Sequence, residues 1–140
     1  MLKLGVVLSA LLAVGCASAP RPVAERDRFP LDPREQLTGP FDDGIGRGWD
    51  ALLAGDLARA EEEFQRAEGG PGELAAGIGL IEIWVLDGHP DRAIAACHDA
   101  LRTGEGTAPL LVACAEAHVE KSNPMEALRL YDRALARLPG

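Results

Sequence analysis

Aromatic side chains are scarce in this 140-residue chain. They make up only 4% of the residues, whereas 47% are hydrophobic and alanine is the commonest of these. Alanine is the best helix former and a poor strand former. The composition therefore argues against a sheet and predicts an all-α protein of closely packed helices. The length allows one domain of ordinary size.

Positive charge is scarce as well, with 14 Lys and Arg residues against 22 Asp and Glu and a formal charge of −8. The sequence contains no basic stripe that could displace counterions from a nucleic acid. We therefore expect no nucleic-acid partner. The acidity serves solubility or favours basic partners.

Sequence motifs for catalysis are missing. No serine stands in a Gly-x-Ser-x-Gly elbow, and no glycine loop has the spacing that cradles a phosphate. Residues 44–48 contain three glycines, but no strand is expected before them and their spacing is wrong for a nucleotide loop. Glu61, Glu62 and Glu63 form a charge run that we expect on a solvated helix face. We therefore expect no catalytic residue and no cofactor, and we classify the chain as a non-enzyme.

The chain also lacks an apolar run of the about 20 residues that a membrane span needs. Its longest run, residues 4–14, follows the positive charge of Lys3 and leads into Leu-Ala-Val-Gly-Cys at residues 12–16. This sequence resembles the bacterial lipobox, in which small residues precede a cysteine that is acylated after cleavage. By that resemblance, residues 1–15 are a lipoprotein signal peptide and Cys16 becomes the lipid-bearing N-terminus.

Acyl chains on Cys16 would hold the protein on a membrane, since each buried methylene contributes about 0.8 kcal/mol. Ala17 follows the cysteine, and the rule that Asp at this position retains a lipoprotein in the inner membrane then implies the outer membrane, facing the periplasm. The alternative is an ordinary secretory signal cut after Ala17 or Ala19, which would discard Cys16.

Residues 16–41 hold five of the ten prolines and show no apolar period of either helix or strand. Proline lacks an N–H donor and biases the preceding residue away from helix, so this stretch is predicted to be a semi-extended tether. Two alternatives stay open. The segment is a plain disordered tether, or Phe29, Leu31 and Phe41 fold back and cover the start of the helical region.

The rest of the chain is built on a repeat. The 13 residues 55–67 recur at 88–100 and 122–134, so that the copies start 33 and then 34 residues apart. Each copy opens on a small residue and then places alanine, a bulkier residue and alanine at fixed offsets. These positions are Gly55, Ala60, Phe64 and Ala67, then Gly88, Ala93, Cys97 and Ala100, then Ser122, Ala127, Tyr131 and Ala134. Such a period is the signature of a helical repeat array.

This pattern is similar to that of the tetratricopeptide repeat (TPR) family, whose unit is a pair of antiparallel helices. The first helix of that unit carries a small residue and then an aromatic one three positions later. The corresponding pairs here are Gly48 with Ala51, Ile81 with Trp84, and Ala115 with His118. The resemblance implies a short right-handed α-solenoid of three helix hairpins, over residues 42–72, 73–106 and 107–140.

Local signals predict where each helix starts and stops. We expect helices over about 42–54, 57–68, 73–87 and 90–103, one after Thr107 as N-cap, and one from Asn123 to Pro139. The glycines at 44, 46 and 48 predict an irregular first turn in the first helix. Pro90 and Pro124 occupy the first helical position that proline favours, and Asn123 with Glu126 has the spacing of a capping box.

In this family the first helices of each hairpin line a concave groove that takes a peptide. By repeat phase, the floor would be apolar with three carboxylates, suited to a partner segment with apolar anchors and Lys or Arg. The inward positions are Ile45, Trp49, Leu52, Ile78, Glu82, Val85, Val112, Glu116, Val119 and Glu120. Trp49 is either the hot spot of this groove or a residue packed under the tether. The Asn and Lys or Arg set that binds a terminal carboxylate is missing.

Two cysteines lie within the repeats. Cys97 and Cys114 belong to helices adjacent in sequence, so in an oxidising compartment they could form a disulfide. The alternative is two buried free thiols that pack as small hydrophobes. Cys114 and His118 share a helix face with Cys97 nearby, but a zinc site needs three or four converging ligands. We favour a core role for these residues and predict no metal, while a thiol or metal site stays an alternative function.

The last helix has no solvating helix after it, unlike most repeat arrays. We expect Leu128, Leu130 and Leu138 to face a partner or a second copy of the chain. These expectations combine into a non-catalytic, membrane-anchored adaptor or assembly factor of the cell envelope, serving secretion, pilus, motility or outer-membrane machinery. The structural alternative is a homo-oligomeric component that uses this end face.

Overall fold

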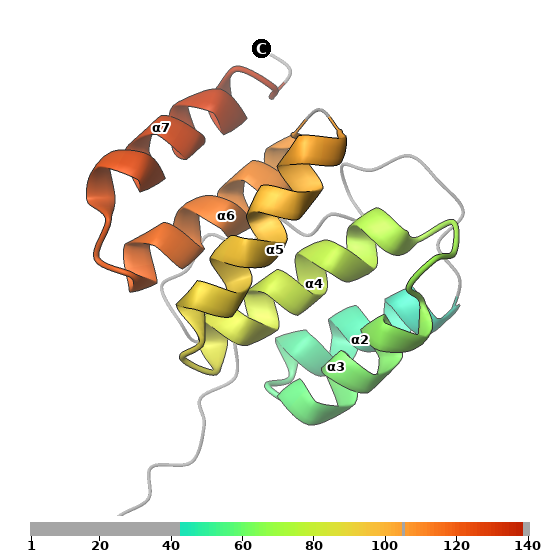
Figure 1. Cartoon of the computed structure of the whole chain (residues 1–140). Coiled ribbons are helices and arrows are strands. Elements are labelled where there is room, and N and C mark those ends of the chain that lie inside the picture. The colour runs from blue at the N-terminus through green and yellow to red at the C-terminus, as the bar shows by residue number, and fades with distance from the viewer. Residues whose placement is uncertain (1–42, 105, 139–140) are drawn as a thin grey trace, which may run out of the picture.

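The computed structural model describes residues 43–104 and 106–138, which form six helices and no strands (Figure 1). The expected all-α class is therefore confirmed. The helices are α2 (Asp43–Leu53), α3 (Leu57–Arg66), α4 (Glu73–Leu86), α5 (Pro90–Thr103), α6 (Ala108–Glu120) and α7 (Pro124–Leu135). The signal peptide, Cys16 and the tether with Phe29, Leu31 and Phe41 lie outside the described residues.

The helices pack in pairs that follow one another along the chain. Helix α2 packs on α3, α4 on α5 and α6 on α7. The first helix of each later pair also contacts both helices of the pair before it, so α4 touches α2 and α3, and α6 touches α4 and α5. Figure 1 shows the three pairs side by side in chain order. The core lies between them, at the alanine and bulkier positions of the repeat.

The turn inside each pair has the same geometry in all three copies. Gly55, Gly88 and Ser122 have φ angles of 82°, 79° and 60°. After each, the next N–H donates to the carbonyl oxygen five residues back: Asp56 to Ala51 at 2.9 Å, His89 to Trp84 at 2.7 Å, and Asn123 to His118 at 2.8 Å. This is the Schellman closure, which satisfies carbonyls left open at a helix end. A small residue recurs at this position because the turn requires a positive φ angle there.

Phe64 explains the glycines in the middle of two helices. Its side chain is 0% exposed, and a Cβ at either Gly48 or Gly79 would lie less than 3.0 Å from its ring carbons. The ring also meets Trp49 edge-on, with centroids 5.6 Å apart. The close packing of α2 and α4 around one aromatic ring therefore requires that these two positions carry no side chain.

The irregular first turn expected for α2 is absent, since the helix is continuous from Asp43. The prediction that Glu63 lies on a solvated helix face is wrong. Its side chain is buried, with 8% of the residue exposed, and its carboxylate accepts a hydrogen bond from Arg47 at 3.1 Å. That hydrogen bond lowers the pKa of Glu63, against the opposing effect of its burial. The two residues tie α2 to α3.

Two of the expected side-chain caps are missing. Asn123 makes no side-chain cap bond to α7, and Thr107 makes none to α6. Glu126 pairs instead with Arg129, whose Nε lies 2.8 Å from a carboxylate oxygen. Helix α7 ends at Leu135 rather than at Pro139. The N–H groups of Arg137 and Leu138 each donate to the carbonyl oxygen three residues back, which closes the last turn. Helix α3 does have a side-chain cap, since a carboxylate oxygen of Asp56 accepts a hydrogen bond from the N–H of Arg59 at 3.2 Å.

Candidate functional site

The ten positions assigned to the concave groove are mostly in the core. Ile45, Trp49, Leu52, Ile78, Val85, Val112 and Glu116 are between 0% and 8% exposed. Glu82 is half-buried, and only Val119 and Glu120, at the end of α6, are exposed. As they stand, the seven buried side chains offer a partner almost no surface, and Trp49 packs on Phe64 as a core residue. Repeat phase gave the position of each residue but not its exposure.

Cys97 and Cys114 are joined by a disulfide, with their Cα atoms 5.7 Å apart. The distance lies in the middle of the range that a disulfide spans. Of the two states left open by the sequence, the structure contains the bridge. It links α5 to α6, and so fastens the second pair of helices to the third. Both cysteines are buried.

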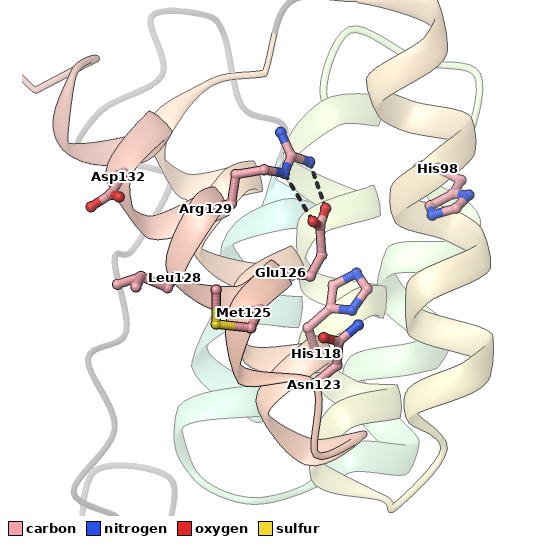
Figure 2. Close-up of a pocket in the computed structure, with 8 residues that line it drawn as sticks. All are labelled: His98, His118, Asn123, Met125, Glu126, Leu128, Arg129 and Asp132. Carbon is pink, nitrogen blue, oxygen red and sulfur yellow. Dashed lines mark hydrogen bonds and ion pairs between the residues drawn. The ribbon is translucent and has the colours of Figure 1, made fainter.

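Beside the disulfide, a groove of about 630 Å³ runs between α5 and α7 (Figure 2). His98 enters from α5, while His118 rises from the end of α6. On the α7 side, Arg129 holds the carboxylate of Glu126 through two nitrogens. Sequence reasoning placed His118 near the cysteines but did not find this groove, because the spacing of α5 and α7 depends on how two pairs stack.

His118 is the one buried titratable group in this groove, with 8% of its surface exposed. Its burial lowers the pKa of the imidazole, the neighbouring Glu126 opposes this effect, and His98 and Arg129 lower the pKa further. The imidazole is therefore neutral near pH 7. Its Nδ1 has no hydrogen-bond partner among the described residues. The hydrogen bond from Arg129 lowers the pKa of Glu126 and raises that of the guanidinium.

The groove does not assemble a metal centre. Within residues 43–104 and 106–138, no three His, Cys, Asp or Glu side chains are grouped so that they could hold an ion. Cys97 and Cys114 are consumed by their disulfide and supply no thiolate. In this oxidised form these cysteines and His118 therefore supply no ligand set for a metal.

No family of proteins, curated protein or solved structure matches this chain. Among the described helices, none is both long and apolar enough to cross a membrane.

Helix α7 carries an exposed apolar face, but not with all the residues expected. Met125, Leu128 and Leu135 are 76%, 56% and 65% exposed. Leu130, expected on this face, is instead 2% exposed and belongs to the core, and Leu138 is half-buried. The α7 face is therefore made by Met125, Leu128 and Leu135. Helix α7 packs only one of its faces against the core, so these three side chains on the other face contact solvent or another molecule.

A second cleft, of about 720 Å³, lies between α4 and α5. Its wall is mostly apolar and comes from most of the length of α4, the second half of α5 and the start of α6. The lining residues are Glu68, Glu73, Leu74, Gly77, Ile78, Leu80, Ile81, Trp84, Ala96, Asp99, Ala100, Thr103, Gly104 and Leu110. Sequence reasoning missed this cleft, and its one local mark is Gly77, a glycine inside a helix that the repeat pattern does not require.

Proposed function

We propose that the chain is a non-catalytic, lipid-anchored protein-interaction module of the bacterial cell envelope, built as a short right-handed solenoid of three TPR-like hairpins. The observation that carries this proposal is the threefold recurrence of one turn, with a positive φ at Gly55, Gly88 and Ser122 and the same backbone bond after each. Repeated hairpins that stack in chain order are the construction of binding arrays.

The stacking contacts support the same interpretation. In such an array the first helix of each hairpin touches both helices of the preceding one, as α4 and α6 do. The lipobox-like residues 12–16 support a lipid anchor at Cys16 and a position at the outer membrane facing the periplasm. A tether of about 25 residues reaches roughly 30 Å, so even a weak contact gains from a high effective concentration.

The surfaces available to a partner differ from the concave floor that repeat phase suggested. Exposed apolar side chains lie at Leu74, beside the α4–α5 cleft, and at Met125, Leu128 and Leu135 on α7. Docking surfaces combine such apolar side chains with a polar rim. These two regions, rather than the buried Trp49, are where we expect envelope proteins to bind.

Site-directed photocrosslinking on the full-length protein in membranes of its host tests the proposal. A photoreactive side chain at Leu74 or Met125 is expected to capture a discrete protein, while the same group at the 2% exposed Trp49 captures none. Labelled palmitate should enter the wild type and not Cys16→Ala. If neither exposed position yields an adduct, the adaptor function is wrong. If the wild-type protein takes up no labelled palmitate, the proposed lipid anchor is wrong.

A homo-oligomer is the second candidate, and the α7 face favours it. Two such faces related by a two-fold axis would bury Met125, Leu128 and Leu135 of both copies. Leu128→Glu with Leu135→Glu should then convert a dimer to a monomer in solution. Leu74→Glu, which adds a charge at an exposed leucine outside α7, is the control. A wild type that is already monomeric at high concentration excludes this candidate.

A further inference from the structure

The cleft between α4 and α5 has an apolar floor with an open mouth. Ile78, Ile81 and Leu110 are between 1% and 3% exposed at its base, while Leu74 at its edge is 41% exposed. In Figure 1 the two helices lie closest near the turn that joins them and separate toward their other ends. The contact between them is correspondingly less extensive than within the other two pairs. The separation opens the cleft.

Gly77 lines this cleft, and the fold gives no packing reason for a glycine there. Gly79, in the same helix, is required by Phe64, whereas a Cβ at Gly77 would meet nothing within 4 Å. Glycine is among the least favourable residues inside a helix. The open space above Gly77 lets a large side chain from another molecule approach the backbone of α4 closely.

The charged residues that line the cleft are all acidic. Glu68, Glu73 and Asp99 are exposed, and no Lys, Arg or His is among the lining residues that the structure describes. The carboxylates of Glu68 and Glu73 make no hydrogen bond or ion pair with another described residue. The carboxylate of Asp99 pairs only with the exposed Arg102, at 3.6 Å. Nearby Arg92 stacks on the ring of Trp84, 4.2 Å from its centroid, and does not line the cleft. The charge pattern is complementary to a basic segment.

We propose that the α4–α5 cleft binds a segment of another protein that inserts one large apolar side chain over Gly77 and places Lys or Arg beside Glu68, Glu73 and Asp99. The span of α4 from Leu74 to Trp84 is about 15 Å, which accommodates about five residues of extended chain. A buried apolar anchor with a charged rim is the usual arrangement of a short-segment docking site. This inference rests on the proposed adaptor function and names the chemistry of its partner.

The test uses phage-displayed random nonapeptides selected on the full-length protein in detergent. Enriched peptides are expected to carry one Leu, Ile, Met or Phe with Lys or Arg on either side. Their affinity should fall at least tenfold in Gly77→Leu, whose side chain fills the cleft. It should fall several-fold in the double variant Glu68→Gln with Glu73→Gln, and also when salt is raised from about 50 to 300 mM, a change that screens exposed charge.

Matched controls separate the cleft from general effects. Gly46→Leu makes the same substitution in α2, where a Cβ also meets nothing within 4 Å, and it should leave the affinity unchanged. Asp87→Asn with Asp132→Asn removes the same charge elsewhere and should have little effect. Leucine favours helix over glycine, so Gly77→Leu should melt no lower than the wild type. A lower melting temperature would show that the space over Gly77 is not open and would overturn the site.

The remaining outcomes also decide the matter. Peptides that bind Gly77→Leu as well as the wild type, or that lack basic residues, overturn the proposed site while the crosslinking result at Met125 still decides the adaptor function. Self-association that Gly77→Leu abolishes would assign the cleft to a second copy and overturn a foreign partner. An absence of any enriched peptide overturns the proposed site, and combined with an absence of crosslinks it overturns the adaptor function as well.

Discussion

At the scale of single residues, Phe64 determines which positions of its neighbours must be glycine. Gly79→Ala would force a methyl group into the ring, and overpacking of this kind costs about 1–3 kcal/mol of unfolding free energy. Gly77→Ala, two residues earlier in the same helix, meets open space and should instead stabilise by up to about 1 kcal/mol. Urea unfolding of the two variants measures the difference. Equal effects of both substitutions would contradict this role of Phe64.

The repeated turn makes a second prediction for single residues. Ser122 adopts a left-handed φ of 60° at the position where the other two copies have glycine. A side chain in this region costs about 1–2 kcal/mol, partly offset by the greater freedom of glycine in the unfolded chain. Ser122→Gly should therefore raise the unfolding free energy by about 0.5–1 kcal/mol, and the reverse change Gly88→Ser should lower it. Thermal unfolding that moves both variants in one direction would argue against a shared turn.

At the scale of helices, the disulfide between α5 and α6 should contribute a large part of the stability. It closes a loop of 17 residues, for which the loss of chain entropy in the unfolded state corresponds to about 3 kcal/mol. The double variant Cys97→Ala with Cys114→Ala should unfold at a lower denaturant concentration than the oxidised wild type. In reductant the difference should largely vanish. A wild type that does not respond to reductant, with two thiols that react once it is unfolded, would show the cysteines to be free.

Helix starts could be predicted from the sequence because their signals are local, whereas the end of α7 at Leu135 was not. Pro90 and Pro124 at first helical positions and a small residue in each turn act within a few residues of where they stand. The exposure of each helix face could not be predicted in the same way. Leu130 and Leu135 look alike in sequence, yet one is 2% and the other 65% exposed, because the neighbouring helix covers only one of them.

The same reason explains which parts of the candidate sites were missed. Gly79 could not be recognised as obligatory, since the ring that requires it belongs to another helix. Trp49 was a reasonable surface anchor by repeat phase and is a core residue in the structure. The α4–α5 cleft depends on the separation of two helices, and that separation is a property of the whole pair and of no single residue. The position of each residue within the repeat could therefore be predicted from the sequence, but the exposure of its side chain could not.

At the scale of the whole molecule, stability should depend on pH through one buried histidine and a few paired carboxylates. Burial lowers the pKa of His118 below its usual value near 6.5. The unfolded chain therefore takes up this proton at a higher pH than the folded chain does. Between the two pKa values the unfolded state binds more protons, so acidification favours unfolding. The effect of His118 is absent above about pH 7.5 and grows as the pH falls through about 6.5 toward the folded pKa.

The carboxylates act in a separate and more acidic window. Glu63 and Glu126 have lowered pKa values because Arg47 and Arg129 hydrogen-bond to them, so their contribution is present above about pH 4.5 and is lost as the pH falls below it. Melting temperatures from pH 8 to pH 3 should therefore decline in two steps. His118→Phe should remove only the step that begins as the pH falls through about 6.5, and Glu63→Gln should reduce only the step below about pH 4.5. A first step that persists in His118→Phe would show that another group, and not this imidazole, responds to mild acid.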